Sequence, residues 1–541
     1  MQIRTTLTVL ALSVMLAACN DNNSSSSTPT GSGSSTYPIR VASLSAAEFQ
    51  GQLMASASGT ALKNIPGNTP VCGFDVHYMQ YGTVGGAGEK TSATGAMLIP
   101  TGTSTACTGP RPIVLYAHGT TISKNYNLAD VTDPNNPASG EFALIATFFA
   151  AQGYIVVAPN YAGYDKSPLP YHPYLNAQQQ SQEMIDILAA ARANLPKTPA
   201  GASVSDSGKL FVTGYSQGGH VAMATLQALQ AKGMTVTAGA PMSGPYSMAL
   251  FGDAIFGGNV NVGGTLFAPL LAASYQNSYG NVYGSITDIY NPIYATGLDT
   301  LLPGSLSTDQ LFSMNKVPQS ALFQANPPAP YASLDPISPA SPSFAFGFDS
   351  TNYLIQTGYR AAYLGDASAN PDQVTANTGY FAAATPANNL RKDLKANDLR
   401  TYKPTMPVLM CGGNADPTVF FQPNTQVMYG AMTVQGTTTF AMVDVAAASN
   451  ALTTTTLTSG QQSGMAVPVG TAQAVFSGGQ TQVYSGTYKA VYSADIAAGM
   501  STENATADAT GQATVAVAKA YHGSLVPPAC MVAARGFFQQ F

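Results

Sequence analysis

A serine between two closely spaced glycines, in Gly214-Tyr-Ser-Gln-Gly218, constrains the fold of this chain more than any other feature. An apolar run, 209–213, precedes it, and a helical pattern begins at Gly219. This order predicts a strand, a sharp turn and a helix, with the hydroxyl of Ser216 exposed at the apex beside the helix N-terminus. The glycines are expected because the strand and helix backbones pass close together there. With 52 Gly in 541 residues the motif alone is weak evidence, so the partners of the serine must supply the rest.

The composition bounds the size of the core and excludes one class of partner. A chain of 541 residues with 45% hydrophobic residues can bury a large core. Charged residues make up only 9% of the chain, whereas about 25% is usual in globular proteins. The surface is therefore expected to be polar but largely uncharged. A net charge of -5 gives no basic surface, so no nucleic-acid partner is expected.

The N-terminal residues have the pattern of an export signal. Met1-Gln-Ile-Arg4 is basic, and the apolar stretch 7–16 is too short to span a membrane. The end of this stretch, Leu16-Ala-Ala-Cys19, resembles the lipobox of bacterial lipoproteins. The resemblance implies a signal peptide over 1–19 and a lipid anchor on Cys19, with an ordinary cleaved signal as the alternative.

The residues that follow the signal are predicted to form a flexible tether over 20–36, because they are almost all Ser, Thr, Gly and Asn. In lipoproteins of this kind, the residue after the lipobox cysteine influences the final membrane. By this resemblance, Asn20 implies that the protein is located at the outer membrane. The chain is thus expected to be an exported bacterial lipoprotein held at a membrane by its N-terminal lipid.

Four further cysteines form an even set, which in an exported chain predicts two disulfides. They are Cys72, Cys107, Cys411 and Cys530. Three connectivities are possible. Pairing Cys72 with Cys107 and Cys411 with Cys530 would close one local loop and join the last strand region to the C-terminal helix. Metal binding is the weaker alternative, because the chain has no Cys-x-x-Cys and its five histidines are scattered, so no metal or cofactor is expected.

Apolar strands alternate with helical patterns along most of the chain. This alternation predicts an α/β fold with a mostly parallel eight-stranded sheet and helices on both faces. The expected strands are 71–78, 94–100, 112–117, 154–158, 209–213, 236–240, 406–411 and 438–445, and the expected helices are 142–151, 174–195 and 219–233.

Two long segments depart from this alternation. Residues 246–400 are rich in Pro, Tyr, Phe and Asn and are predicted to form a largely helical cap over the site. Residues 446–515 are rich in Thr, Ala, Gly and Gln and almost uncharged, and are predicted to be a small β-rich insertion or a poorly ordered one. The core would then consist of 37–245, 401–445 and 516–541.

A nucleophilic serine requires donors for the oxyanion that forms when it attacks a carbonyl. The third expected strand ends in Tyr116-Ala-His-Gly-Thr120, where a glycine lets the backbone turn and present N–H groups. The backbone N–H groups of Thr120 and Gln217 are the predicted oxyanion hole, with Gly119 as the alternative to Thr120. His118 is interpreted as a structural ring that holds this turn.

The serine also requires a base, and five histidines allow the base to be chosen by elimination. His77 lies on an early strand, His172 lies in a Pro-rich loop, and His118 belongs to the oxyanion turn. His220 lies one turn beyond the serine, with its ring expected to point away from the apex. His522 follows the last expected strand and precedes the final helix, so it is the predicted base, carried on a loop; a surface histidine without a role is the alternative.

The base requires an acidic group, which should lie between the serine and the histidine in the chain. Asp416 directly follows the seventh expected strand, at the end of the sheet where sites form in open α/β folds. An ordinary Asp-Pro turn is the alternative interpretation, and Asp444 is the second candidate. A disulfide between Cys411 and Cys530 would hold the Asp416 and His522 segments together.

These motifs resemble those of the α/β-hydrolase superfamily. More narrowly, the chain resembles the secreted lipase/esterase branch, which includes secretory lipases of the Candida lipase A type. The resemblance covers roughly 70–245 and 400–541, and it implies a serine ester hydrolase with a cap between strands six and seven and no metal or cofactor. It rests on the oxyanion turn, the serine motif, the placement of Asp416 and His522, and the segments Gly153-Tyr-Ile-Val-Val-Ala-Pro-Asn-Tyr161 and His172-Pro-Tyr-Leu175. Asn160, Lys166 and the long insertion before His522 depart from the family pattern and leave the substrate open.

The predicted function is hydrolysis of carboxylic esters through an acyl-enzyme intermediate, with Ser216, His522 and Asp416 as the triad. An aromatic, sparsely charged cap favours an apolar acyl or aryl ester, either a small molecule or a lipid. A serine peptidase on the same fold is one alternative, although peptidases usually need a charged anchor for the peptide terminus. A non-catalytic surface lipoprotein on a hydrolase scaffold is the other.

Overall fold

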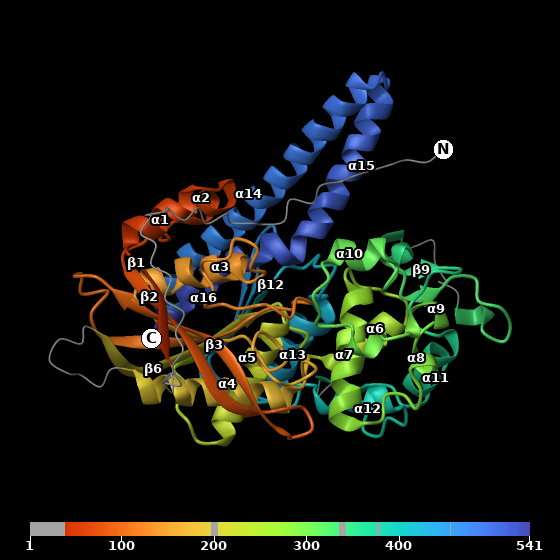
Figure 1. Ribbon diagram of the computed structural model, residues 1–541, viewed down its shortest axis with the longest axis horizontal. Coiled ribbons are helices and arrows are strands. Elements are labelled where there is room, and N and C mark those ends of the chain that lie inside the picture. The colour runs from red at the N-terminus through yellow and green to blue at the C-terminus, as the bar shows by residue number, and fades with distance from the viewer. Residues whose placement is uncertain (1–37, 196–203, 335–341, 376–378, 455) are drawn as a thin grey trace, which may run out of the picture.

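The computed structural model describes residues 38–195, 204–334, 342–375, 379–454 and 456–541 (Figure 1). The predicted signal segment with Cys19 and the predicted tether over 20–36 lie outside these ranges. No helix in the described part of the chain combines the length and the apolar character that crossing a membrane requires.

A ten-stranded sheet forms the centre of the molecule, in the order β1-β2-β3-β5-β4-β6-β7-β12-β13-β14. The strands β5, β4, β6, β7, β12 and β13 run parallel to one another, and the flanking strands pair antiparallel. The strands are β1 (Ile39–Leu44), β2 (Gly73–Val84), β3 (Lys90–Thr101), β4 (Gly109–Ala117), β5 (Ile155–Pro159), β6 (Val204–Tyr215), β7 (Ala238–Met242), β12 (Val408–Gly412), β13 (Phe440–Asp444) and β14 (Leu452–Thr453).

The eight predicted strands are all present, and β1 and β14 add one strand at each edge of the sheet. These two were missed because β1 is mostly exposed and β14 has only two residues, so neither carries an apolar run. By contrast, β5, β7 and β12 are buried along their whole length, as expected for strands covered on both faces.

Helices cover both faces of the sheet (Figure 1). On one face α4 (Ala177–Asn194) packs beside α5 (Gln217–Ala231), and on the other α3 (Ser139–Phe148) packs beside α16 (Val526–Phe538). α1 (Ala46–Met54) packs on α2 (Ala57–Asn64), which lies next to α3, and α13 (Val427–Val434) joins β12 to β13. Asn176 caps α4 by accepting a hydrogen bond from the backbone N–H of Gln179, whereas α5 begins directly at the serine turn.

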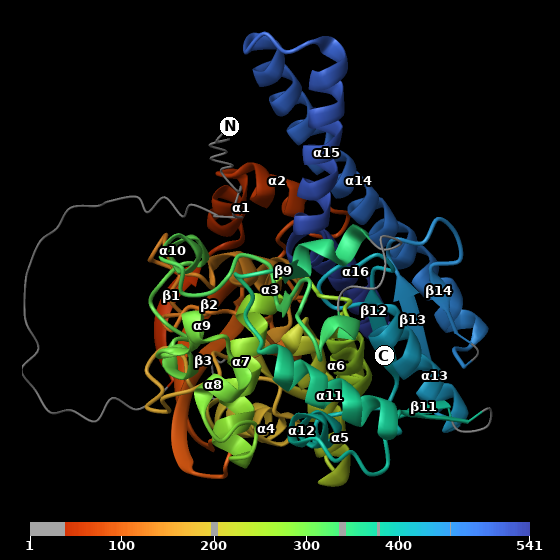
Figure 2. The same cartoon turned by 90° about the vertical axis from the view of Figure 1, so that its right-hand side faces the viewer.

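The segment predicted to be a cap consists mainly of short helices between β7 and β12 (Figure 2). Its helices are α6 (Met248–Phe256), α7 (Gly264–Tyr279), α8 (Ile286–Ile289), α9 (Pro292–Ala295), α10 (Thr308–Ser313), α11 (Thr357–Ala369) and α12 (Asn389–Ala396). Two small sheets pair β8 (Phe323–Gln324) with β9 (Phe348–Asp349) and β10 (Gln373–Thr375) with β11 (Gly379–Phe381). These elements bury a hydrophobic cluster of their own, separate from the core around the sheet.

The prediction of a β-rich or poorly ordered insertion over 446–515 is wrong. Most of this segment is a helical hairpin of α14 (Ser459–Ala497) and α15 (Thr502–Ala520), which projects from the body in both views (Figures 1 and 2). Thr458 starts α14 with a capping box, and Ser501 caps α15. The Thr and Gly content suggested strand or coil, but tertiary packing overrides these propensities.

Two buried stripes explain why the hairpin is stable. In α14 the buried residues recur at helical spacing, and they pack on the body: Met465, Val469, Ala472 and Phe476. In α15 the buried residues are three alanines at spacings of four, which let the two helices approach closely: Ala505, Ala509 and Ala513. The α14 spacing was a usable sequence signal, whereas alanines are too weakly hydrophobic to mark a helix face.

Candidate active site

The serine motif forms the sharp turn between β6 and α5. Ser216 has φ 61° and ψ -124°, a strained backbone conformation for a residue with a side chain. A Cβ on Gly218 would lie 1.9 Å from the Ala117 carbonyl oxygen, and one on Gly214 would lie 2.4 Å from the Gly218 oxygen. Both glycines are therefore required by the close approach of strand and helix, as the sequence predicted.

The three residues predicted as a triad lie in one hydrogen-bonded line. His522 Nε2 lies 2.7 Å from Ser216 Oγ, and His522 Nδ1 lies 2.6 Å from Asp416 Oδ2. Asp416 Oδ1 accepts the backbone N–H groups of Thr418 and Val419 at 2.9 and 3.0 Å, which orients the carboxylate. With Nδ1–H donating to Asp416, Nε2 is free to accept the serine proton.

These residues meet because two of them follow parallel strands that lie on either side of β7. Ser216 follows β6 and Asp416 follows β12, at the carboxyl ends where sites form in open α/β sheets. His522 was expected on a loop, but it lies in a π-helical turn (Tyr521–Leu525) that connects α15 to α16. The turn is wider than an α-helical one, so a π segment inside a helix often marks a functional residue.

One of the two disulfides joins segments of this arrangement. Cys411, in β12, pairs with Cys530, in α16, and Cys72 pairs with Cys107. Of the three possible connectivities, the structure thus contains the one that joins the Asp416 strand to the helix that follows His522.

Asp444, the second candidate for the acid, has other partners. Its carboxylate accepts hydrogen bonds from the backbone and side-chain N–H of Asn414 at 3.1 and 2.8 Å and from the backbone of Ala446 at 3.0 Å. The carboxylate in contact with His522 is that of Asp416.

In the turn after β4, the hydrogen bonds distinguish the two candidate donors for the oxyanion hole, Gly119 and Thr120. The backbone N–H of Gly119 donates to Glu141 Oε1 at 3.0 Å, so it is already engaged. Within the described residues, the N–H groups of Thr120 and Gln217 donate to no protein acceptor. Glu141 also accepts from the hydroxyls of Tyr116 and Tyr126, at 2.7 and 3.0 Å, and so anchors the turn.

His118 has the contacts of a structural residue. Its buried ring stacks on Tyr161 and Tyr126, with centroids 4.0 and 4.3 Å away. Its Nδ1 lies 2.7 Å from the Gly119 carbonyl oxygen and its Nε2 lies 3.1 Å from that of Asn160. Burial lowers the pKa of His118, which favours a neutral ring that holds the turn in place.

Two residues of the site were not predicted. Tyr215 donates a hydrogen bond to the backbone carbonyl of His522, and His172 Nε2 lies 2.6 Å from the side-chain nitrogen of Gln217. Burial lowers the pKa of His172 to about 3, so the neutral ring accepts from Gln217 while its Nδ1–H donates to Ala162 at 2.9 Å. Neither contact has a sequence signal, because each joins residues that are far apart in the chain.

The described residues contain no cluster of His, Cys, Asp and Glu that could hold a metal ion.

Residues 141–265 match the model of the prolyl oligopeptidase family, a stretch that contains Ser216 but neither Asp416 nor His522. No curated protein matches the chain.

Comparison with solved structures gives likenesses over most of the chain. The rice cell wall degrading esterase LipA from Xanthomonas oryzae is 26% identical with a TM-score of 0.58, over 76% of this chain and 90% of that one. A candidate hydrolase from Legionella pneumophila is 20% identical with a TM-score of 0.54, over 74% of this chain and 88% of that one. Candida antarctica lipase A is 14% identical with a TM-score of 0.44, over 69% of this chain and 72% of that one, which is too weak to support a narrower branch.

The sheet and these likenesses define the class: the chain has the α/β-hydrolase fold. Within that class, the family match and the similarity to an esterase make it a hydrolase of the serine type.

Proposed function

We propose that the protein hydrolyses carboxylic esters, with Ser216 as nucleophile, His522 as base and Asp416 as the group that orients it. The line of hydrogen bonds from Asp416 through His522 to Ser216 carries this proposal. His522 Nε2 would take the serine proton as Oγ attacks the ester carbonyl, and the N–H groups of Thr120 and Gln217 would stabilise the oxyanion. The proton would pass to the departing alcohol, and water activated by the same nitrogen would release the acid from the acyl-enzyme.

We propose a neutral ester with an apolar acyl or aryl part as the substrate. Two buried arginines of the cap region are already paired: Arg391 with Asp253 and Asp366, at 2.9 and 2.7 Å, and Arg400 with Asp372 and Asp398, at 2.7 and 2.8 Å. These charges are therefore not available to bind an ionic substrate. Beside the oxyanion turn, the hydroxyls of Thr120 and Tyr174 lie 3.0 Å apart, which supplies polar but uncharged contacts.

We also propose that Cys19 carries the lipid that holds the protein at a membrane. The motif Leu16-Ala-Ala-Cys19 supports this proposal. Labelling of cells with an alkyne fatty acid should mark the full chain, and Cys19→Ser should abolish the label. An unchanged label would place the lipid elsewhere.

Peptide hydrolysis is the second candidate, because the family match over residues 141–265 is to the prolyl oligopeptidase family. A non-catalytic role on the same scaffold is the third. Activity on amide substrates and the effect of replacing Ser216 distinguish these three candidate functions.

The deciding experiment measures hydrolysis of p-nitrophenyl esters from acetate to palmitate and of apolar peptide p-nitroanilides. The protein would begin at residue 38, with Ser216→Ala as the control. Ester activity that disappears in Ser216→Ala supports the proposal, and the preferred chain length separates esterase from lipase. Anilide activity alone would favour the peptidase. A folded protein inactive on both series would overturn both enzymatic candidates.

A further inference from the structure

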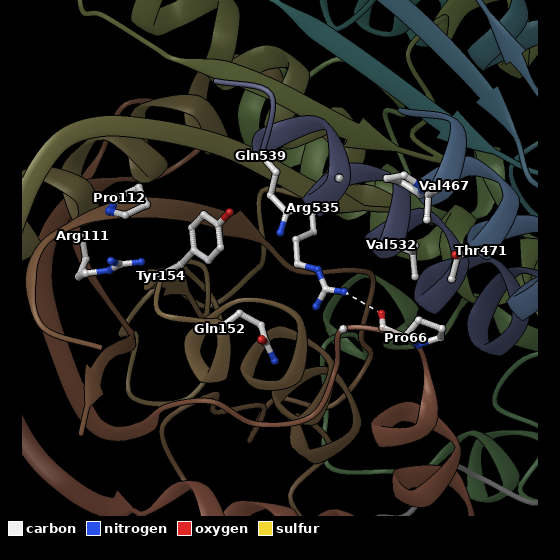
Figure 3. A pocket seen from close by; sticks show the side chains of 13 residues that line it. Pro66, Arg111, Pro112, Gln152, Tyr154, Val467, Thr471, Val532, Arg535 and Gln539 are labelled. Carbon is white, nitrogen blue, oxygen red and sulfur yellow. Dashed lines mark hydrogen bonds between the residues drawn. The ribbon is translucent and has the colours of Figure 1, made fainter. Parts of the chain in front are cut away.

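A cavity lies at the opposite end of the sheet from Ser216. It encloses about 540 Å³ between α16, the start of α14, the loop before β2 and the first residues of β4 (Figure 3). Arg111, in its wall, lies near the start of β4, whereas the oxyanion turn at His118 follows the end of that strand. Seven extended residues span roughly 23 Å, so this cavity is distinct from the active site.

Arg535 of α16 enters this cavity without a carboxylate partner. Its residue is only 6% exposed. Its guanidinium donates to Asn68 Oδ1 at 2.7 Å and to the Pro66 carbonyl at 3.3 Å, and it lies over the Phe148 ring, 5.3 Å from the centroid. None of the ion pairs among the described residues includes Arg535. A buried guanidinium with no anion is unfavourable, because an arginine stays charged and loses its hydration on burial.

Arg111 lies in the same wall and is also without a carboxylate. It donates to the carbonyl oxygens of Gly153 and Thr105, at 2.7 and 3.4 Å. Tyr154 lies between the two arginines, as Figure 3 shows, and its hydroxyl makes no hydrogen bond within the described structure. Burial raises the pKa of Tyr154, while the charges of Arg535 and Arg111 both lower it, which places each guanidinium within electrostatic reach of the hydroxyl.

Of the three other buried arginines in the described part of the chain, Arg360 donates to the backbone carbonyls of Phe256 and Leu334 and lies over the rings of Phe323 and Phe348, whereas the other two have carboxylate partners. Arg391 and Arg400, with side chains 2% and 0% exposed, are each paired with two aspartates. The cavity therefore contains two cations and an unbonded hydroxyl where the cap region contains complete ion pairs. Two guanidinium groups without a carboxylate partner on one wall can bind an anion.

The remaining wall is largely apolar. Val467 and Pro468 come from the first turns of α14, and Val532 comes from α16. A volume of about 540 Å³ falls within the roughly 300–1,000 Å³ of small-molecule sites. The cavity can thus hold an apolar body as well as a charged head.

We propose that this cavity binds an amphiphilic organic anion, with a carboxylate or phosphate head between Arg111 and Arg535 and its apolar body along Val467, Pro468 and Val532. Guanidinium groups bind both kinds of oxyanion through paired N–H donors. The head could belong to a free fatty acid or to a phosphorylated lipid, and the probes below distinguish the two. This proposal does not depend on the catalytic one.

The test measures binding to the full chain by isothermal titration calorimetry, with decanoate, decyl phosphate, decanol and decyltrimethylammonium as probes. We expect decanoate or decyl phosphate to bind at least tenfold more tightly than decanol, and the cation not to bind. The tighter of the two anions identifies the head group. Equal binding of decanol, or no binding of either anion, would overturn the proposal.

Variants locate the site without disturbing the core. Val467, 77% exposed at the rim, allows Val467→Glu to place a repelling charge at the entrance. Val515→Glu, on α15 at a residue 51% exposed, is the matched control because it does not line the cavity. We expect Val467→Glu and Arg111→Gln each to weaken anion binding about tenfold or more and Val515→Glu to leave it unchanged. Anion binding that survives both cavity variants would place the ligand elsewhere and refute the site.

Discussion

The hydroxyl of Tyr215 lies 2.5 Å from the backbone carbonyl oxygen of His522, so the residue before the serine holds the main chain of the histidine. The same hydroxyl lies 3.3 Å from His522 Nδ1, and the two rings are 5.0 Å apart. Burial, and then the nearby charge of Asp416, raise the pKa of Tyr215, which keeps its hydroxyl protonated as a donor. The serine turn and the histidine turn, 306 residues apart, are thus joined by a buried hydrogen bond besides the one between His522 and Ser216.

Tyr215→Phe should remove this bond while keeping the ring. We expect kcat for ester hydrolysis to fall about tenfold with little change in KM, and the free energy of unfolding to fall by about 1–3 kcal/mol because the His522 carbonyl loses its buried donor. Tyr402→Phe is the matched control, since it removes a tyrosine hydrogen bond to Gln230, at 3.1 Å, that does not involve the triad. Equal effects of both variants on kcat would argue against positioning by Tyr215.

Asp416→Asn should keep the geometry but change the tautomer of His522. The new Oδ1 can still accept from Thr418 and Val419, which turns the amide nitrogen toward His522 Nδ1. His522 would then carry its proton on Nε2 and could not accept one from the serine, so we expect kcat to fall about 10⁴-fold. Asp444→Asn is the control and should retain near-normal kcat. A larger loss in Asp444→Asn than in Asp416→Asn would reverse the assignment of the acid.

Removal of the Cys411–Cys530 disulfide should affect both stability and rate. The chain-entropy model assigns a stabilisation of about 5 kcal/mol to the Cys411–Cys530 disulfide, which closes a loop of 119 residues. It assigns about 4 kcal/mol to the 35-residue loop of Cys72–Cys107. Both double Ala variants should therefore unfold at lower urea concentration. Only loss of Cys411–Cys530 should also lower kcat at a temperature where the protein stays folded, because this bond joins the Asp416 strand to the helix after His522. Similar kcat losses in both variants would contradict that role.

Acid should destabilise the fold through two buried histidines. Burial lowers the pKa of His172 to about 3 and that of His220 to about 4. Between these values and the unfolded value of about 6.5, the unfolded chain binds more protons, so stability is complete above about pH 6.5 and is lost as the pH falls below it. Each histidine should account for about 2 kcal/mol of the loss between pH 6.5 and pH 5.

The check is urea unfolding of His220→Gln and the parent protein at pH 5 and pH 7. We expect the pH 5 penalty to shrink by about 2 kcal/mol in the variant. Burial raises the pKa of Glu183 to about 7, so Glu183 changes stability with pH in the opposite direction. This contribution is the same in the parent and the variant, so it cancels when the two are compared. An unchanged penalty would show that His220 does not titrate on unfolding in this range.

The helical hairpin should gain stability from alanine at its exposed glycines. Gly478 and Gly486 lie inside α14 with open space around the Cβ position. Each Gly→Ala should therefore stabilise the protein by about 0.5–1 kcal/mol. Gly499→Ala is the matched control: it also has open space, but its φ of +84° in the hairpin turn penalises a side chain. Calorimetric melting should show opposite shifts, and a lower melting temperature for Gly486→Ala would contradict a continuous helix.

The three residues of the proposed triad could be chosen from the sequence because each carries a local signal. Ser216 has the glycine spacing, Asp416 directly follows an apolar strand, and only five histidines compete for the third role. The hairpin over 459–520 was not predicted, because its inner face in α15 is made of alanines and its many threonines and glycines have low helix propensity. Its stability comes from contacts with the body and between its helices.

By itself, the sequence determined eight of the ten strands of the main sheet, three of the helices that cover it, the glycines of the serine turn and the identity of the residues available for chemistry. Only the tertiary structure decided which of them meet: Tyr215 with His522, His172 with Gln217, and Arg111 with Arg535 around one cavity. The physical reason is the distance along the chain over which each kind of interaction acts. Backbone turns and hydrophobic periodicity act within a few residues and leave a pattern in the chain, whereas a contact across tens or hundreds of residues depends on how the layers pack and leaves none.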